Sequence, residues 1–126
     1  MKLIALGLFF IFLSFLSAVS CQGAEKTYIK TFCKKWKGEA EVTLIDNTRV
    51  DCLTKDYAVE VEFARKWKEP IAQSLHYALV TGKKAKIFLI CESSDEDKYA
   101  ERIKSLIMYY DLPIELETLG CSKQNN

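Results

Sequence analysis

The sequence predicts an α/β protein with a central mixed sheet flanked by helices, in the element order α-β-β-β-α-β-α-β. Residues 39–63 hold three short runs with strand-like patterning, separated by turn signals. After them, segments of helical period alternate with further apolar runs. A meander that continues into helix-strand units builds one sheet covered by helices. At 126 residues, the chain fits a single domain.

The first half of the mature chain accounts for one helix and three strands. Residues 25–36 fit a short basic helix with Tyr28, Ile29 and Phe32 turned inward, and Gly38 ends it. The run "EAEVTLI" alternates, "DNT" is a turn signal and "RVDCL" follows, which predicts a hairpin. After the turn "TKD", the run "YAVEVEF" has strong β-propensity and predicts a third strand.

The second half predicts two helices and two strands. A helical period runs from about Ala64 to Val80, and Gly82 is a natural stop. "AKIFLIC" is typical of a central strand, "SSDEDKYAERIKSLIMYY" of a capped amphipathic helix and "PIELETL" of a short edge strand. Residues 119–126 are expected to form a flexible tail. One face of the first of these helices is expected to gather Ile71, Ala72, Leu75, Ala78 and Leu79.

Residues 1–20 have the layout of a secretory signal peptide, which leaves one domain over 21–126. Lys2 precedes an apolar run, and Ala18-Val19-Ser20 is an acceptable cleavage triplet. The run is slightly short for a spanning helix of about 20 residues, so an uncleaved anchor is the weaker interpretation. Cys21 directly after this triplet also resembles a bacterial lipoprotein box. We therefore expect an exported protein: periplasmic, anchored to the membrane as a lipoprotein, or extracellular.

The five cysteines fit export but leave their pairing open. If Cys21 is lipidated or removed, Cys33, Cys52, Cys91 and Cys121 are enough for two disulfides in an oxidising compartment. Cys52 and Cys91 also lie in apolar runs, where buried free thiols are equally plausible. No C-x-x-C or Cys/His spacing suggests zinc.

The overall charge does not by itself demand a polyanionic partner. The formal net charge is +1, and Lys2 is the one charged residue of the predicted signal peptide, so the mature chain has 17 basic and 17 acidic residues. The segment "EKTYIKTFCKKWKG" is basic and "CESSDEDKYAE" is acidic. A basic segment can steer a polyanion locally, although charge runs are commonly solvated faces.

Three acids occupy positions in the predicted strands where apolar residues are usual. Asp51 lies between Val50 and Cys52, and Glu60 and Glu62 point to one face of the next strand. Such carboxylates either form a polar strand face paired with Lys or Arg, or repel one another and resist burial. A divalent cation relieves both penalties, and Mg²⁺ takes one or two carboxylates plus water.

These residues resemble the PD-(D/E)XK, or restriction-endonuclease-like, nuclease superfamily, in the pattern "GEAE…VD…VEVEFARKW…QSLHY". The resemblance spans roughly residues 25 to 118 and implies that family's α-βββ-α-β core. According to this resemblance, Asp51 matches the family's Asp on the second core strand. Glu60 matches the first acid of the family's E-x-K motif. Glu41 matches an upstream Glu contributed near the first strand or helix. Val50 replaces the motif's Pro.

The resemblance continues onto the next helix but departs at the motif lysine. Gln73 and Tyr77 match the Q-x-x-x-Y of the helicase-associated exonuclease branch. Glu62 stands where the family has Lys, and Lys66, four residues on, is expected to take that role. His76 is expected to have a helix-surface role, because this nuclease chemistry needs no histidine.

The resemblance implies an exported Mg²⁺- or Mn²⁺-dependent nuclease that hydrolyses phosphodiester bonds of nucleic acid, with DNA the expected substrate. The expected metal ligands are Asp51, Glu60 and Glu41; the expected catalytic residues are Asp51, Glu60, Glu62 and Lys66, with Gln73 and Tyr77 orienting the substrate. The alternative is a non-catalytic secreted binding module or lipoprotein that retains the fold. The presence of Glu62 in place of the motif lysine favours this alternative.

Overall fold

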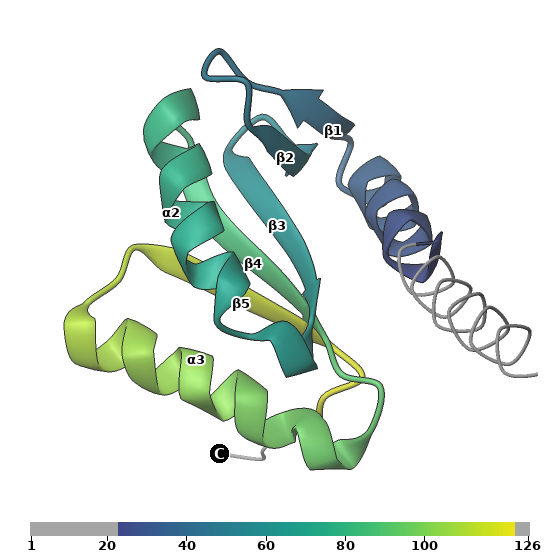
Figure 1. The fold of residues 1–126 in the computed structure, drawn as a ribbon, viewed down its shortest axis with the longest axis vertical. Coiled ribbons are helices and arrows are strands. Elements are labelled where there is room, and N and C mark those ends of the chain that lie inside the picture. Colours follow the sequence, from purple (N-terminus) through teal and green to yellow (C-terminus); the bar gives the residue numbers. More distant parts are fainter. Residues whose placement is uncertain (1–22, 123–126) are drawn as a thin grey trace, which may run out of the picture.

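The computed structural model describes residues 23–122, in which five strands form one mixed sheet between helices (Figure 1). The predicted signal peptide, residues 1–20, and Cys21 lie outside these described residues. The predicted α/β class and element order are confirmed. The first helix covers residues 23–35, and the elements that follow are β1 (Glu39–Thr43), β2 (Arg49–Leu53), β3 (Tyr57–Phe63), the 3-10 helix η1 (Ala64–Lys66), α2 (Glu69–Thr81), β4 (Lys84–Ile90), the 3-10 helix η2 (Ser94–Glu96), α3 (Asp97–Tyr110) and β5 (Ile114–Leu119).

The strands lie in the sheet in their sequence order, β1-β2-β3-β4-β5. The β1–β2 and β2–β3 pairs are antiparallel, whereas β3–β4 and β4–β5 are parallel. Parallel neighbours require crossover connections, which α2 and α3 provide. Two right-handed crossovers in the same direction place their helices on one face, and α2 and α3 lie together there in Figure 1.

The first helix, residues 23–35, covers the opposite face of the sheet. Its Ile29 and Cys33 are buried against Val59 and Phe63 of β3. A disulfide joins Cys33 to Cys52 of β2. Gly38 permits this close approach, because a Cβ atom there would lie 2.7 Å from the sulfur of Cys52. The helix is therefore linked covalently to the strand that contains Asp51.

A second disulfide joins Cys91, directly after β4, to Cys121, two residues after the end of β5. The expected flexible tail over 119–126 is therefore wrong at its start. Leu119 ends β5, and its carbonyl accepts a hydrogen bond from the Cys91 amide at 2.8 Å. Residues 123–126 lie outside the described part of the chain.

The segment predicted as one helix from about Ala64 is divided in two. Pro70 fits the first turn of a helix, since it lacks an amide hydrogen that this position leaves unpaired, and α2 accordingly begins at Glu69. The preceding 3-10 helix contains Lys66. The predicted apolar face is also wrong in part: Ala72 is exposed and Leu79 is 80% exposed, whereas Ser74 and Tyr77 are buried. Ile71, Leu75 and Ala78 pack against the core as expected.

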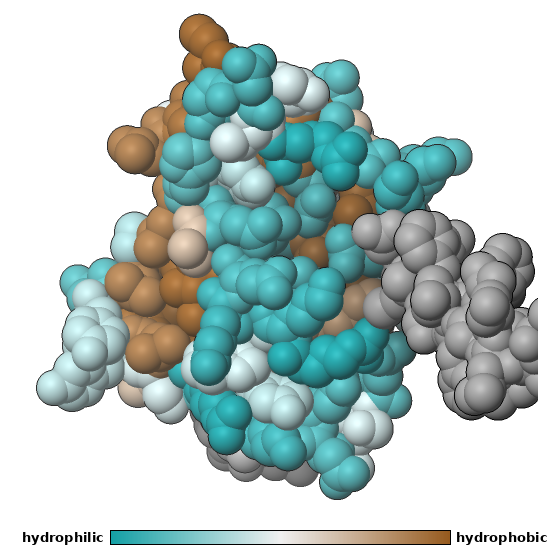
Figure 2. Space-filling model, in the orientation of Figure 1, coloured by the Kyte–Doolittle hydropathy of each residue, from teal (hydrophilic) through white to brown (hydrophobic). Residues whose placement is uncertain are grey.

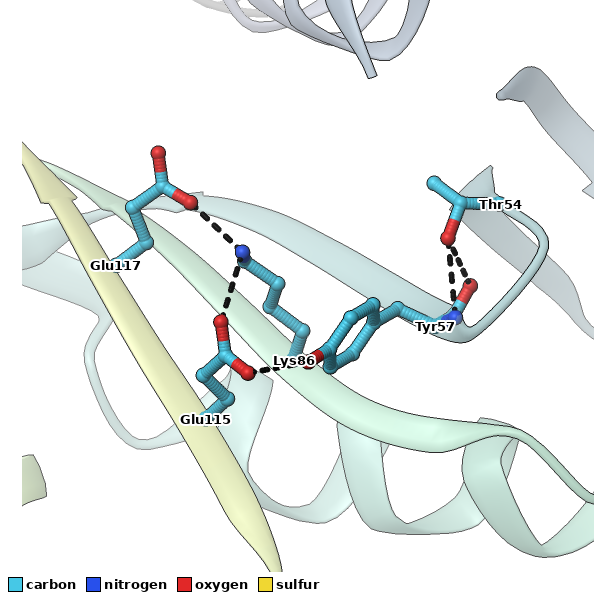
Figure 3. Close-up of polar contacts among 5 residues, drawn as sticks. All are labelled: Thr54, Tyr57, Lys86, Glu115 and Glu117. Carbon is cyan, nitrogen blue, oxygen red and sulfur yellow. Dashed lines mark hydrogen bonds and ion pairs between the residues drawn. The ribbon is translucent and has the colours of Figure 1, made fainter. Parts of the chain in front are cut away.

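Lys86 ties the last two strands together on the face covered by the first helix (Figure 3). Its ammonium group lies 3.0 Å from Glu115 and 2.7 Å from Glu117, both on β5. The Tyr57 hydroxyl donates to Glu115 at 2.6 Å, which adds β3 to the network. These acids of the edge strand are neutralised by a lysine and partly open to solvent.

No helix within residues 23–122 is long and apolar enough to cross a membrane.

Candidate active site

A cavity of about 680 Å³ opens on the sheet face that α2 covers, above β2 and β3. In the orientation of Figure 1, the surface between α2 and the first helix is predominantly hydrophilic, and hydrophobic side chains gather on the other side of α2, toward α3 (Figure 2). Except for Glu41, every predicted site residue lines the cavity. Its full lining is Glu25, Thr43, Asn47, Thr48, Arg49, Asp51, Glu60, Glu62, Lys66, Glu69, Gln73 and Tyr77.

Asp51 and Glu60 face each other on neighbouring strands. Cys52 pairs with Val59 in the antiparallel register of β2 and β3, and the next position along sets Asp51 opposite Glu60. The Asp51 carboxylate also accepts a hydrogen bond from the Val61 amide at 2.9 Å. The Val61 amide therefore donates to a side chain, whereas in a regular strand ladder it would donate to a backbone carbonyl.

The strand alternation is interrupted where Asp51 meets β1. Val50 and Cys52 flank Asp51, yet Val50 packs with Tyr77 on the α2 face while Cys52 packs under the first helix. Opposite them, Glu41 has a φ of 55°, a left-handed conformation that costs a non-glycine residue roughly 1–2 kcal/mol. This irregular backbone redirects the side chains at the position where Asp51 enters the cavity.

Glu60 and Glu62 are buried, with only 5% and 6% of their surface exposed. Glu62 accepts a hydrogen bond from the Phe63 amide at 2.8 Å. One carboxyl oxygen of Glu60 has no hydrogen-bond partner among the described residues, and the same is true of the side-chain oxygen of Gln73. Unpartnered buried oxygens are costly, so these atoms are the strongest local sign of an external ligand.

The pKa values of all three acids are raised by their surroundings. Burial is the largest cause for each of them. The negative charge of Asp51 raises the pKa of Glu60 further, and burial raises the pKa of Glu62 to about 7. At neutral pH the charged form of this cluster is therefore penalised unless a positive charge is supplied.

The Glu-x-Glu patterns of β3 and β5 behave in opposite ways. Glu115 and Glu117 on β5 both contact Lys86, whereas neither Glu60 nor Glu62 has an ion pair within 4.0 Å among residues 23–122. The interpretation of strand acids as a polar face paired with basic residues therefore fits β5. It does not fit β3.

Lys66, Gln73 and Tyr77 approach the acids from η1 and α2. Lys66 is exposed at the rim and lowers the pKa of Glu62 by its charge, although burial outweighs it. Tyr77 is buried, and its pKa is raised by burial and by the charges of Glu60 and Asp51. His76 does not line the cavity; its Nε2 lies 2.7 Å from Asp46 at the surface.

The structure separates Glu41 from the other predicted ligands. Glu41 does not line the cavity, and its carboxylate lies 3.9 Å from the Arg49 guanidinium. Glu25, on the first helix, lines the cavity instead, together with Arg49 and Glu69. The sequence pattern did not indicate these three. Glu25 lies 26 positions before Asp51 on a separate element, and only tertiary packing brings it close.

One group of three close potential metal ligands occurs among the described residues: Cys91, Asp97 and Cys121. The two cysteines form a disulfide, which leaves them no thiolate to offer. The cavity acids do not form a comparably tight cluster of three. The facing pair Asp51 and Glu60 fits Mg²⁺, which commonly takes one or two carboxylates and keeps several waters.

No protein family, curated protein or solved structure matches this chain. A function has to be argued from the chemistry of the cavity.

Proposed function

We propose that this protein is an exported nuclease that depends on Mg²⁺ or Mn²⁺ and has a restriction-endonuclease-like fold. One observation carries the proposal: two buried glutamates and a facing aspartate line a cavity without an ion pair among residues 23–122, beside Lys66, Gln73 and Tyr77. The observed order of one helix, three strands, a helix and a strand supports the fold assignment. The substrate class is nucleic acid, with DNA as the first substrate to test.

Asp51 and Glu60 would hold the cation, with Glu62 beside them. The unpartnered oxygen of Glu60 and the pKa values of Glu60 and Glu62, raised chiefly by burial, fit carboxylates that are buried without a compensating positive charge. A bound divalent cation lowers the pKa of a coordinated water and offsets charge on a phosphodiester.

The other lining residues would act on the substrate or on the acids. The Lys66 ammonium would hold a nonbridging phosphate oxygen at the rim of the cavity. The Gln73 amide and the Tyr77 hydroxyl would orient the acids and the bound strand. Glu25 would take the place of the upstream glutamate that the resemblance implies, because it lines the cavity and Glu41 does not.

Export is supported by the two disulfides. Disulfides persist in oxidising compartments and are rare in reducing ones. Cys33–Cys52 and Cys91–Cys121 therefore fit a protein that works outside the cytosol.

The test compares Asp51→Asn with wild type in two assays. Wild type should gain stability with Mg²⁺ by RT ln(1 + [L]/Kd), about 2.7 kcal/mol at 100 times Kd, and should cut DNA. Asp51→Asn removes a ligand charge at nearly constant size and should lose most of the gain and the cleavage. Asp95→Asn, an exposed change away from the cavity, is the matched control.

Two results would overturn the proposal in different ways. A wild-type melting temperature that rises with Mg²⁺ or Mn²⁺ without cleavage of DNA or RNA would leave a metal-binding module that lacks catalysis. A melting temperature unmoved by either metal would make the acidic cluster structural.

A further inference from the structure

A second hollow, of about 430 Å³, adjoins the acidic cavity. The two share Lys66 and Glu69, so one continues into the other. Trp67 and Arg102 line this hollow and also a third one of about 540 Å³. We call the second and third hollows the basic–aromatic groove. Its defining side chains are Lys66, Trp67, Lys68, Tyr99 and Arg102.

Cations and aromatic rings alternate along this groove. The Arg102 guanidinium lies 5.6 Å from the centre of the Trp67 ring and 5.4 Å from that of Tyr99. On the other side, the Lys68 ammonium lies 5.6 Å from the Trp67 ring. Trp67 is half-buried against the core cluster beneath α3, so its ring has a fixed position.

Positive charge is in excess along the groove: its acids are Glu69 and Glu101, and its cations are Arg65, Lys66, Lys68, Lys98 and Arg102. Lys66, Lys68 and Arg102 are exposed and form no ion pair within 4.0 Å among residues 23–122. Other surface cations do have carboxylate partners: Lys104 lies 2.7 Å from Glu101 on the same helix as Arg102. Exposed cations over aromatic rings, next to the proposed metal site, favour an anionic ligand with flat apolar groups.

We propose that the basic–aromatic groove binds single-stranded nucleic acid and delivers its backbone to the acidic cavity. The inference rests on the proposed function and specifies its substrate. Unpaired bases stack on aromatic rings while a basic groove follows the phosphates. Paired bases have no free face to offer Trp67. An acidic peptide would match the charge of the groove but would leave its rings without stacking partners.

The first experiment measures binding of a labelled oligo-dT by fluorescence anisotropy, with the disulfide-bonded protein in EDTA to prevent cleavage. Arg102→Ala should weaken binding about five- to tenfold and make the salt dependence less steep by about 0.7, the loss of one phosphate contact to a single strand. Lys30→Ala removes one positive charge from the exposed side of the first helix, outside the groove, and should change neither quantity. A duplex of equal length should bind more weakly than the single strand.

The second experiment reads Trp67 directly, without the risk of unfolding that its removal brings. The chain has two tryptophans, and Trp36 lies under the first helix on the other face of the sheet. Trp36→Phe therefore leaves Trp67 as the sole reporter. Its fluorescence should be quenched by oligo-dT and unchanged by poly-glutamate.

The results separate the groove from the nuclease. Equal losses of oligo-dT affinity in Arg102→Ala and Lys30→Ala, preference for duplex, or quenching by poly-glutamate would overturn the proposed role of the groove, even if the protein cuts DNA. Binding and quenching by oligo-dT would support the groove even if no cleavage occurred, in which case the nuclease proposal alone fails.

Discussion

At the scale of single residues, the burial of Glu60 and Glu62 makes stability depend on pH. A carboxyl group whose pKa is raised on folding binds its proton more tightly in the folded state than in the unfolded state. Its contribution to stability is therefore fully present below the unfolded pKa and is lost as pH rises through the folded pKa. This is the reverse of the usual behaviour of a salt-bridged acid.

We predict that the metal-free protein loses stability as pH rises from about 4.5 through about 7, the window set by Glu62. The expected loss is roughly 1–3 kcal/mol, and Glu60 extends the window upward because its pKa is raised further. The free energy of unfolding, measured with denaturant at a series of pH values in EDTA, tests this prediction.

Glu62→Gln is the matched variant, since glutamine has nearly the same shape as glutamate but has no group that titrates. It should flatten the stability profile between pH 4.5 and 7, and saturating Mg²⁺ should flatten the wild-type profile by supplying the missing charge. A wild-type profile that rises over this window in EDTA would contradict the prediction.

Lys66→Ala is predicted to separate metal binding from catalysis. An ammonium group cannot ligate a cation, so the Mg²⁺-dependent gain in melting temperature should persist. Cleavage should fall by about 10²–10³, the effect of removing one electrostatic stabiliser of a transition state. Lys30→Ala, an exposed change on the first helix away from the cavity, should alter neither reading. Loss of the metal effect in Lys66→Ala would show that Lys66 has a structural role instead.

At the scale of elements, the disulfide Cys33–Cys52 connects two of the segments that build the cavity. Cys33 lies on the helix that contains Glu25, and Cys52 is adjacent to Asp51. The helix otherwise lies at one face of the sheet, held by the packing of residues such as Ile29. The geometry of the acids therefore depends on this covalent link as well as on the strand register.

We predict that Cys33→Ser/Cys52→Ser costs about 2–4 kcal/mol of stability, the usual value for a native disulfide. It should also weaken Mg²⁺ binding, measured by calorimetry, because Glu25 and Asp51 lose their fixed relative position.

Cys91→Ser/Cys121→Ser provides the matched control. This second disulfide joins the ends of β4 and β5 and does not line the cavity. Its removal should cost a similar amount of stability but leave the Kd for Mg²⁺ unchanged under folding conditions. Equal effects of the two double variants on metal affinity would contradict a specific role for Cys33–Cys52.

At the scale of the whole molecule, removal of the predicted signal peptide and formation of the two disulfides are expected to occur together. Protein isolated from its native host should have lost about twenty residues, with the chain beginning at or near Cys21. Its intact mass should also reflect the hydrogens lost in forming both disulfides. A full-length, fully reduced chain in the cytosol would contradict the localisation, and an added lipid mass on Cys21 would identify the lipoprotein form.

Several features were readable from local sequence because they depend on neighbouring residues. The alternation of "YAVEVEF", the apolar run before Cys91 and the amphipathic pattern after residue 97 predicted their elements to within a few positions. The predicted cap of that helix was wrong, since α3 has no side-chain cap and follows the 3-10 helix η2. The strand meander was enough to set Asp51 and Glu60 on adjacent strands. The predicted start of the helix at Ala64 was wrong. The apolar period extended back to Ala64, but Pro70 fits the first turn of a helix, so α2 begins at Glu69.

The sequence by itself determined the α/β class, the order of the elements and the presence of misplaced acids in two neighbouring strands. Only the tertiary structure decided which acids share the cavity, since the sequence pattern indicated Glu41 and packing brings Glu25 to the cavity instead. It also decided the disulfide pairing, and which Glu-x-Glu pattern has a lysine. Periodicity records contacts within a strand or a turn, whereas these outcomes depend on segments that meet only after the chain has folded.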